Sequence, residues 1–118
     1  MEKAKTFEEL VVWQKAHQFV LQIYQFTRLF PSSETFGLSS QLRRAAVSIA
    51  ANIAESFNRR TSAERVRFLS FSKGSLEECR YYLILAHDLE YGDTSALFSL
   101  LGVVNRLLQS FTSRISYR

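Results

Sequence analysis

Apolar residues recur every three or four positions along most of the chain, the spacing of α-helices with one buried face. The C-terminal segment shows this spacing most plainly, at Leu97, Leu100, Leu101, Val104, Leu107, Leu108, Phe111 and Ile115. Three stretches rich in turn residues interrupt the pattern, at 29–37, 57–64 and 91–95. The pattern therefore predicts an all-α protein, an antiparallel up-down-up-down four-helix bundle that forms a single domain over residues 1–118.

Short motifs mark where these helices should begin and end. Thr6 to Glu9 and Thr61 to Glu64 both read T-x-x-E, a capping box in which the threonine oxygen accepts an unpaired backbone N–H at a helix start. Gly92 followed by Asp93 reads as a helix stop and then the N-cap of the last helix. The motifs thus predict three helix starts and one helix end.

The first helix carries a wider apolar surface than one face of a bundle needs. Its polar residues fall within an arc of roughly 100° on a helical wheel. The apolar ones spread over about 200°; they are Trp13, Ala16, Phe19, Val20, Ile23, Tyr24, Phe26 and Phe30. Either the helix is buried on two sides within one chain, or its second flank packs on another subunit. Because an exposed apolar strip of that size favours association, we expect a homo-oligomer.

The second helix has a clear core stripe, formed by Leu38, Leu42, Ala45, Ile49 and Ile53. The rest of it is mostly alanine and serine, which lets neighbouring helices approach closely. Arg43 and Arg44 are about 100° apart on the wheel and cannot share a face. The two arginines therefore need separate explanations.

Antiparallel pairing of the second and third helices places particular charges at the same level. With a turn near residue 60, Arg44 lies opposite Glu77 and Glu78, and Glu55 lies opposite residues 63–67, which include two arginines. Such pairs contribute about 0 to 1 kcal/mol each when exposed. This geometry predicts that Arg44 serves the bundle.

Positive charge is concentrated around the second helix and the turn after it. Residues 38–67 hold six arginines against two glutamates, a surplus equal to the formal net charge of +4 of the whole chain. Basic clusters bind phosphates, so the candidate nucleic-acid-binding residues are Arg43, Arg44, Arg59, Arg60, Arg65 and Arg67. Arg59 and Arg60 sit in a turn with no acid beside them, and we assign these two chiefly to binding. The alternative is that they are simply solvated charges.

The sequence predicts neither an enzyme nor a cofactor. Neither His17 nor His87 follows a glutamate by three residues, as a di-iron bundle requires, and no phosphate-binding loop or zinc spacing is present. Cys79 is expected to be a small core residue, and Gly74 to mark a close contact between helices. Ser48, Asn52 and Ser75 are candidate interhelical hydrogen-bonding positions.

The same sequence lacks a membrane-spanning run and an N-terminal signal segment. No charge-free apolar run approaches the roughly 20 residues of a transmembrane helix, and the N-terminus "MEKAKTFEEL" has no apolar block. We therefore expect a cytoplasmic protein that does not bind membranes.

Three stretches carry a resemblance to a known family: "VVWQKAH" at 11–17, "FGLSSQLRRAAVSIAANIAES" at 36–56 and "FLSFSKGSLEECRYYLILAHDLEY" at 68–91. The chain resembles the bacterial four-helix-bundle proteins encoded in intervening sequences of 23S ribosomal RNA genes. That family is similar to the accessory variability proteins of diversity-generating retroelements. The resemblance implies an antiparallel bundle, a homopentamer, association with nucleic acid and a reverse transcriptase, and no known catalysis.

This sequence departs from the family pattern at two positions. Ala50 and Ser56 stand where the family often has proline and glycine. Alanine at 50 should leave the second helix straighter, because proline would remove a backbone hydrogen bond there. Neither departure touches the candidate arginines.

Two functions from different classes remain open. The first is a nucleic-acid-binding accessory protein, in which oligomerisation multiplies a modest basic patch of each subunit. It predicts binding of RNA or DNA that weakens steeply with salt. The second is a protein-interaction or scaffold module, in which the arginines serve internal pairs and the outer surface recruits a protein partner.

Overall fold

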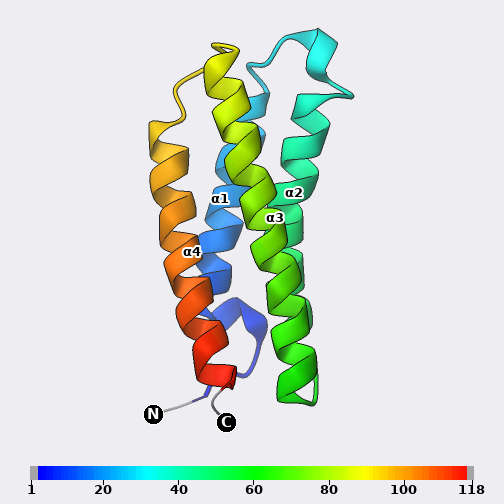
Figure 1. Cartoon of the computed structure of the whole chain (residues 1–118), viewed down its shortest axis with the longest axis vertical. Helices are drawn as coiled ribbons and strands as arrows, with labels where there is room; N and C mark the ends of the chain where they lie inside the picture. Colours follow the sequence, from blue (N-terminus) through cyan, green and yellow to red (C-terminus); the bar gives the residue numbers. More distant parts are fainter. Residues whose placement is uncertain (1–2, 117–118) are drawn as a thin grey trace.

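The computed structural model describes residues 3–116 as an antiparallel bundle of four helices, 46 × 23 × 20 Å in extent (Figure 1). The helices are α1 (Val11–Thr27), α2 (Leu38–Phe57), α3 (Ser62–Asp88) and α4 (Ser95–Ser116). Two short 3-10 turns, η1 (Phe7–Glu9) and η2 (Ser32–Glu34), precede α1 and α2. The turn between α2 and α3 lies at the same end as both termini. The predicted all-α four-helix bundle is confirmed.

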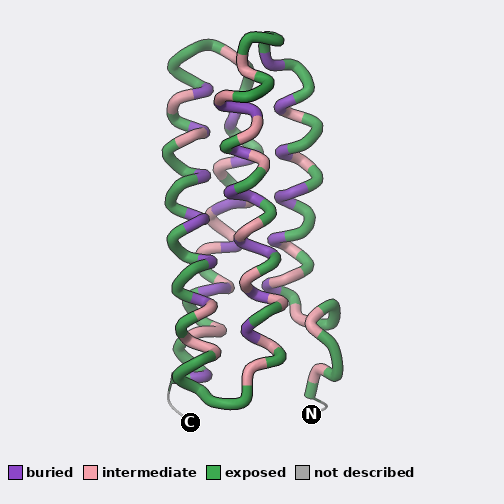
Figure 2. The backbone as a smooth tube through the Cα atoms, turned by 90° about the vertical axis from the view of Figure 1, so that its right-hand side faces the viewer, coloured by how far each residue is buried: buried purple, intermediate pink, exposed green. Residues whose placement is uncertain are grey.

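The core is the stripe predicted for α2, extended by residues of the other helices. All five stripe residues are buried, from Leu38 to Ile53, and Figure 2 shows the buried positions of each helix turned toward the bundle axis. The prediction for Cys79 is confirmed as well, since its side chain is completely buried. Burial, together with the nearby Glu78 charge, raises the pKa of the Cys79 thiol to about 12.

Helices α2 and α3 pack most closely of all the pairs. The Ser75 hydroxyl donates to the Ser48 hydroxyl across this contact at 2.8 Å, and the buried Ser72 hydroxyl donates to the Ile49 carbonyl at 2.8 Å. These bonds join residues that the antiparallel register placed opposite each other, so the register is confirmed. Among residues 3–116, the Asn52 side chain bonds only within its own helix, to the carbonyl and hydroxyl of Ser48, so the interhelical bond expected of it is not formed there.

The predicted helix starts have mixed outcomes. Thr61 caps α3 as expected, because its hydroxyl accepts the Glu64 N–H at 3.1 Å. Asp93 accepts the N–H of Ser95, the first residue of α4, at 2.9 Å. The prediction at Thr6 is wrong: its side chain makes no capping bond, and α1 begins only at Val11. A separate 3-10 turn precedes the helix, closed by backbone bonds from the Glu9 N–H to the Thr6 carbonyl and from the Leu10 N–H to the Phe7 carbonyl. The Glu9 carboxylate accepts the Lys5 N–H.

Glu90, and not Gly92, ends α3. Glu90 has a φ of 61°, its N–H donates to the His87 carbonyl at 3.0 Å, and the Tyr91 N–H donates to the Ala86 carbonyl at 2.9 Å. This is the Schellman arrangement, with a glutamate where glycine is usual. Gly92 has another reason to be glycine, because a Cβ there would lie 2.7 Å from Cε1 of Phe26.

The wide apolar surface of α1 is explained mostly within one chain. Phe19, Val20, Ile23 and Ala16 are buried. The half-buried Trp13 and Phe26 pack against the core, as does the buried Phe30 after the helix, which leaves only Tyr24 of the predicted set exposed. The second flank therefore gives no independent support for a subunit contact, and the homo-oligomer stays a prediction.

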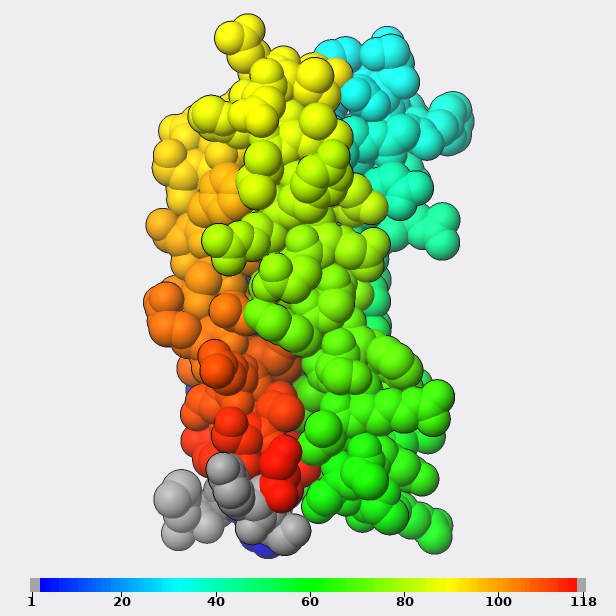
Figure 3. Space-filling model, in the orientation of Figure 1, coloured from blue at the N-terminus to red at the C-terminus, as the bar shows by residue number. Residues whose placement is uncertain are grey.

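Gly74 was expected at a close helix contact, and the structure contradicts this. It lies exposed on α3, and a Cβ added to it would meet no atom within 4 Å. The close packing of α3 on α2 uses the serines at 72 and 75 instead. Figure 3 shows the other seam of α3, where it lies beside α4 on the surface.

Candidate nucleic-acid interface

The six candidate arginines do not form one patch. Arg43 and Arg44 lie in the first half of α2, while the other four, Arg59, Arg60, Arg65 and Arg67, surround the turn between α2 and α3 at the far end of the bundle (Figure 1). In each of these two groups, one arginine uses its guanidinium for contacts within the chain: Arg43 in the first group and Arg59 in the second. The structure therefore separates arginines that hold the fold from arginines that face outward.

Arg43 ties α2 to the end of α1. Its Nε donates to the hydroxyl of the buried Thr27 at 2.7 Å, and its Nη2 donates to the Tyr24 carbonyl at 3.4 Å. Its guanidinium carbon also lies 4.7 Å from the centre of the Tyr24 ring, a cation–π distance. These contacts make Arg43 a residue of the bundle.

Arg44 does not pair with a glutamate of α3, so that prediction is wrong. It is exposed and enters no ion pair within residues 3–116. Glu77 instead binds Lys73, one helical turn away, with Nζ and Oε1 2.9 Å apart. This hydrogen bond holds the pKa of Glu77 below its ordinary value. A local partner on the same helix has replaced the partner expected from the neighbouring helix.

Arg59 has an acidic partner, contrary to the expectation that no acid lies beside it. Its Nη2 lies 2.6 Å from Oε2 of Glu55, one turn earlier in the chain, and its guanidinium carbon lies 4.7 Å from the centre of the Phe68 ring. Its carbonyl accepts the Nε of Arg65 at 2.8 Å. The expected pairing of Glu55 with arginines of α3 is therefore wrong too. Glu55 pairs instead with Arg59, which follows it by four residues just after the end of α2.

Arg60 and Arg67 are exposed at the same turn and enter no ion pair in the described part of the chain. Arg67 lies over the ring of Phe71, 5.6 Å from its centre, which leaves its polar N–H groups at the surface. Together with Arg44, these are the candidate arginines that face solvent without an ionic partner.

The two ends of the bundle carry opposite charge. We call the basic end the one formed by the α2–α3 turn and the chain termini, where cationic residues outnumber Glu8, Glu9, Glu55 and Glu64; they are Lys3, Lys5, Arg59, Arg60, Arg65, Arg67 and Arg114. The acidic end comprises the α1–α2 and α3–α4 loops, where Arg28 stands among Glu34, Asp88, Glu90 and Asp93; Arg43 and Arg44 lie more than one turn away along α2. An anionic partner is attracted to the first of these ends.

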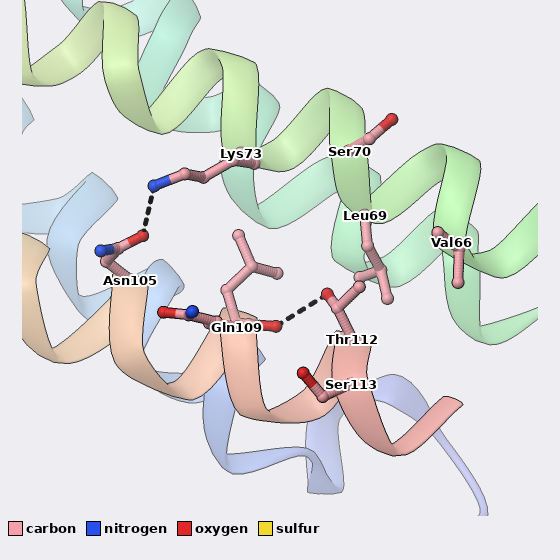
Figure 4. A pocket seen from close by; sticks show the side chains of 9 residues that line it. Val66, Leu69, Ser70, Lys73, Asn105, Gln109, Thr112 and Ser113 are labelled. Atoms are coloured by element: carbon pink, nitrogen blue, oxygen red, sulfur yellow. Dashed lines mark hydrogen bonds between the residues drawn. The ribbon is translucent and has the colours of Figure 1, made fainter. Parts of the chain in front are cut away.

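Sequence reasoning missed a groove between α3 and α4. Its main cleft has a volume of about 370 Å³. Across it, the Lys73 ammonium donates to Oδ1 of Asn105 at 2.6 Å, and lower down Thr112 donates to the Leu108 carbonyl at 2.7 Å (Figure 4). A smaller cleft continues along the same seam beside Arg80 and shares Asn105. The available sequence signal was that residues 94–118 contain arginines and no acid.

No other chemical site competes with these surfaces among the described residues. Within 3–116, no group of three histidine, cysteine or acidic side chains is placed to hold a metal ion. In the same range, no helix has the length and apolar composition needed to cross a bilayer.

The sequence and the fold both match known proteins. The fold is similar to the crystal structure of a protein of unknown function from the S23 ribosomal protein family of Bacteroides thetaiotaomicron. The TM-score is 0.74 at 29% identity, and the match covers 86% of this chain and 98% of that one. No protein of curated function matches the sequence. A family model described as 23S rRNA-intervening sequence protein matches residues 8–113, and the chain therefore belongs to that family.

Proposed function

We propose that the protein is a non-catalytic accessory protein that binds RNA or DNA through the basic end of its bundle. The observation that carries this proposal is the charge asymmetry: cations gather around the α2–α3 turn, while carboxylates gather at the opposite end. Arg60 and Arg67 face solvent there without an ion pair in the described chain. Such cations neutralise phosphates and release counterions, which is the main source of affinity in non-specific nucleic-acid binding.

Association of several copies strengthens this binding. One subunit presents only a few unpaired arginines, so its own affinity for a phosphate backbone is modest. A cyclic homo-oligomer, a pentamer as the family resemblance implies, sets several basic ends on one surface and converts later contacts into intramolecular ones. In a cell, such an assembly would act beside a protein partner such as a reverse transcriptase.

The experiment is a salt titration of nucleic-acid affinity for two single variants. Arg60→Ala and Arg28→Ala each remove one exposed arginine, from the basic and the acidic end respectively. Arg60→Ala should reduce the slope of log K against log salt by about 0.9 for duplex DNA, because one phosphate contact is lost. Arg28→Ala should leave that slope unchanged.

The scaffold function is the second candidate, and one observation favours it. The guanidinium groups of Arg43 and Arg59 both make contacts within the chain. A wild-type protein that binds a specific protein partner, and binds neither RNA nor DNA in a salt-dependent manner, would support this alternative. Equal effects of Arg60→Ala and Arg28→Ala would also reject the basic end, since binding would then follow net charge alone.

A further inference from the structure

The groove along the α3–α4 seam has two chemically different parts. Its floor is apolar, with Val66 and Leu69 from α3 and Leu108 from α4. Its edges carry polar side chains that donate and accept hydrogen bonds, namely Ser70, Asn105, Gln109, Thr112 and Ser113. Figure 4 shows Lys73 and Asn105 reaching toward each other at one end. An occupant therefore needs an apolar body and polar edges.

The charge around the groove selects an anionic occupant. Lys73 and Arg80 of α3 border the two clefts. Arg106 of α4 lies over Gly102, with its Nη1 3.6 Å from where a Cβ on that glycine would be. The acid nearest these cations on α3 is Glu77, which is already bound to Lys73. Since α4 has no carboxylate of its own, Glu77 of α3 offsets one of these three cations, and the seam keeps a net positive charge from them.

Lys73 is available for a further contact. An ammonium group has three hydrogen-bond donors, and the structure accounts for two of them, one to Glu77 at 2.9 Å and one to Asn105 at 2.6 Å. Both of these contacts are at the solvent-exposed lip of the groove. A phosphate oxygen can therefore reach Lys73 without breaking the existing network.

We propose that the α3–α4 groove holds an unpaired stretch of the nucleic acid that the basic end binds. A nucleobase has an apolar face for the floor and a polar edge for the amides of Asn105 and Gln109, while Lys73 and Arg80 contact the phosphates. This inference rests on the proposed function and adds to it a preference for single strands. Proteins that recognise unpaired bases combine a positively charged groove with stacking platforms, usually aromatic, and hydrogen bonds to base edges. Here the aliphatic Val66, Leu69 and Leu108 take the place of the aromatic platform.

A duplex does not fit the same site. Paired bases keep their faces stacked and hidden, and a concave cleft of about 370 Å³ admits only a group that protrudes from its strand. An amphipathic helix of a protein would need a continuous apolar floor, but polar Asn105 is shared by the two clefts and interrupts it. The groove also begins at Val66, next to the arginines of the basic end, so one strand can follow both.

The test compares affinities for a short single-stranded RNA of mixed sequence and the same strand annealed to its complement. Gln109→Leu removes an exposed amide from the groove, and Gln18→Leu removes a matched exposed amide from α1. Gln109→Leu should weaken single-strand binding about tenfold through the lost hydrogen bonds, with the duplex affinity and the salt slope unchanged. Lys73→Gln should lower the single-strand salt slope by about 0.7. Gln18→Leu should match wild type.

Three results would overturn the groove assignment. The first is equal binding of single strands by Gln109→Leu and wild type while salt-dependent binding persists, in which case the basic end alone is the interface. The second is an equal loss of duplex binding. The third is a changed mass of Gln109→Leu in light scattering, which would make the groove a contact between copies. Loss of the proposed function itself looks different, because wild type would then bind neither RNA.

Discussion

Carboxylates at the acidic end hold two loops in place, whereas Arg60 and Arg67 at the basic end enter no ion pair within the described chain. Oε1 of Glu34 accepts the N–H of Leu38, the first residue of α2, at 3.1 Å. Its Oε2 accepts the Tyr91 hydroxyl at 2.8 Å and so joins the α1–α2 loop to the α3–α4 loop. A charge that satisfies a helix N-terminus is part of the fold; a charge that satisfies nothing is free to meet a ligand.

The same contrast holds for the packing around the two ends. At the acidic end the Tyr91 ring lies 5.0 Å from the Phe30 ring, and Gly92 lies directly against Phe26. At the basic end the turn is short and Arg59 is its main internal tie. The acidic end is therefore fixed by a network across two loops, and the basic end by contacts within a single turn, made by Arg59, Thr61 and Arg65.

The largest expected effect comes from crowding the acidic end. Gly92→Ala places a methyl group 2.7 Å from Phe26, at a φ of 158° that L-residues rarely adopt. Movement of Phe26 away from the added methyl group would disturb its packing on Phe30, whose ring centre lies 5.1 Å away. We expect the free energy of unfolding to fall by about 2 kcal/mol, measured by urea denaturation.

Gly74→Ala is the matched control for Gly92→Ala and should have the opposite sign. No atom lies within 4 Å of the added methyl group, and alanine favours a helix over glycine by about 0.5 to 1 kcal/mol. The variant should therefore be more stable than wild type by that amount. A Gly92→Ala protein as stable as wild type would mean that the acidic end is looser than its contacts indicate.

The next effect separates two neighbouring arginines at the basic end. Arg59→Ala removes the contacts to Glu55 and Phe68 and should lower the free energy of unfolding by about 1 kcal/mol. Arg60→Ala, its matched control, should stay within about 0.5 kcal/mol of wild type. Thermal or urea unfolding measures both. Equal stabilities of the two variants would show that Arg59 does not stabilise the bundle. Arg59 would then join Arg60 and Arg67 in the proposed interface.

The helical period was enough to predict the fold and most of the core. Burial of Leu38, Leu42 and Ile53 follows from spacing alone, and the level pairing of Ser48 with Ser75 follows from the antiparallel topology. These features depend on averages over many residues, which makes them robust to any local error. The same averaging explains why the wide apolar surface of α1 suggested a subunit contact. A helical wheel shows which residues are apolar and does not show how many neighbours in the same chain cover them.

Single side chains could not be placed in this way. Arg43 binds Thr27, sixteen residues earlier in the chain, and no local motif announces that contact. Arg44 lost its predicted partner because Lys73 lies one turn from Glu77 on the same helix. The groove exists only once α3 and α4 are packed together, so its sole trace in the sequence was an acid-free last helix with amides at 105 and 109.

The smallest expected effect is a pH dependence of the free energy of unfolding that arises from Glu34, whose hydrogen bonds join the two loops. Hydrogen bonds from the Leu38 N–H and the Tyr91 hydroxyl lower the pKa of Glu34. Because its folded pKa lies below its unfolded value, the stabilisation is present above the unfolded pKa and is lost as the pH falls through the folded pKa. The bond to Glu34 also raises the pKa of Tyr91. Because the folded pKa of Tyr91 lies above its unfolded value, the stabilisation from its hydroxyl is present below the unfolded pKa and is lost as the pH rises through the folded pKa.

Glu34→Gln tests the acidic side of this dependence, since glutamine does not titrate, keeps one of the two acceptor oxygens, and offers the other partner an amide NH2 that donates and does not accept. The stability difference between wild type and Glu34→Gln should be largest near pH 7 and should shrink toward pH 3, below the ordinary glutamate pKa of about 4.3. Urea unfolding at both pH values measures it. Glu8→Gln is the control, because the Glu8 carboxylate accepts no hydrogen bond from residues 3–116. A difference that grows on acidification would show that the Glu34 carboxylate is destabilising, and the acidic end would then owe its order to Gly92, Phe26 and Phe30 alone.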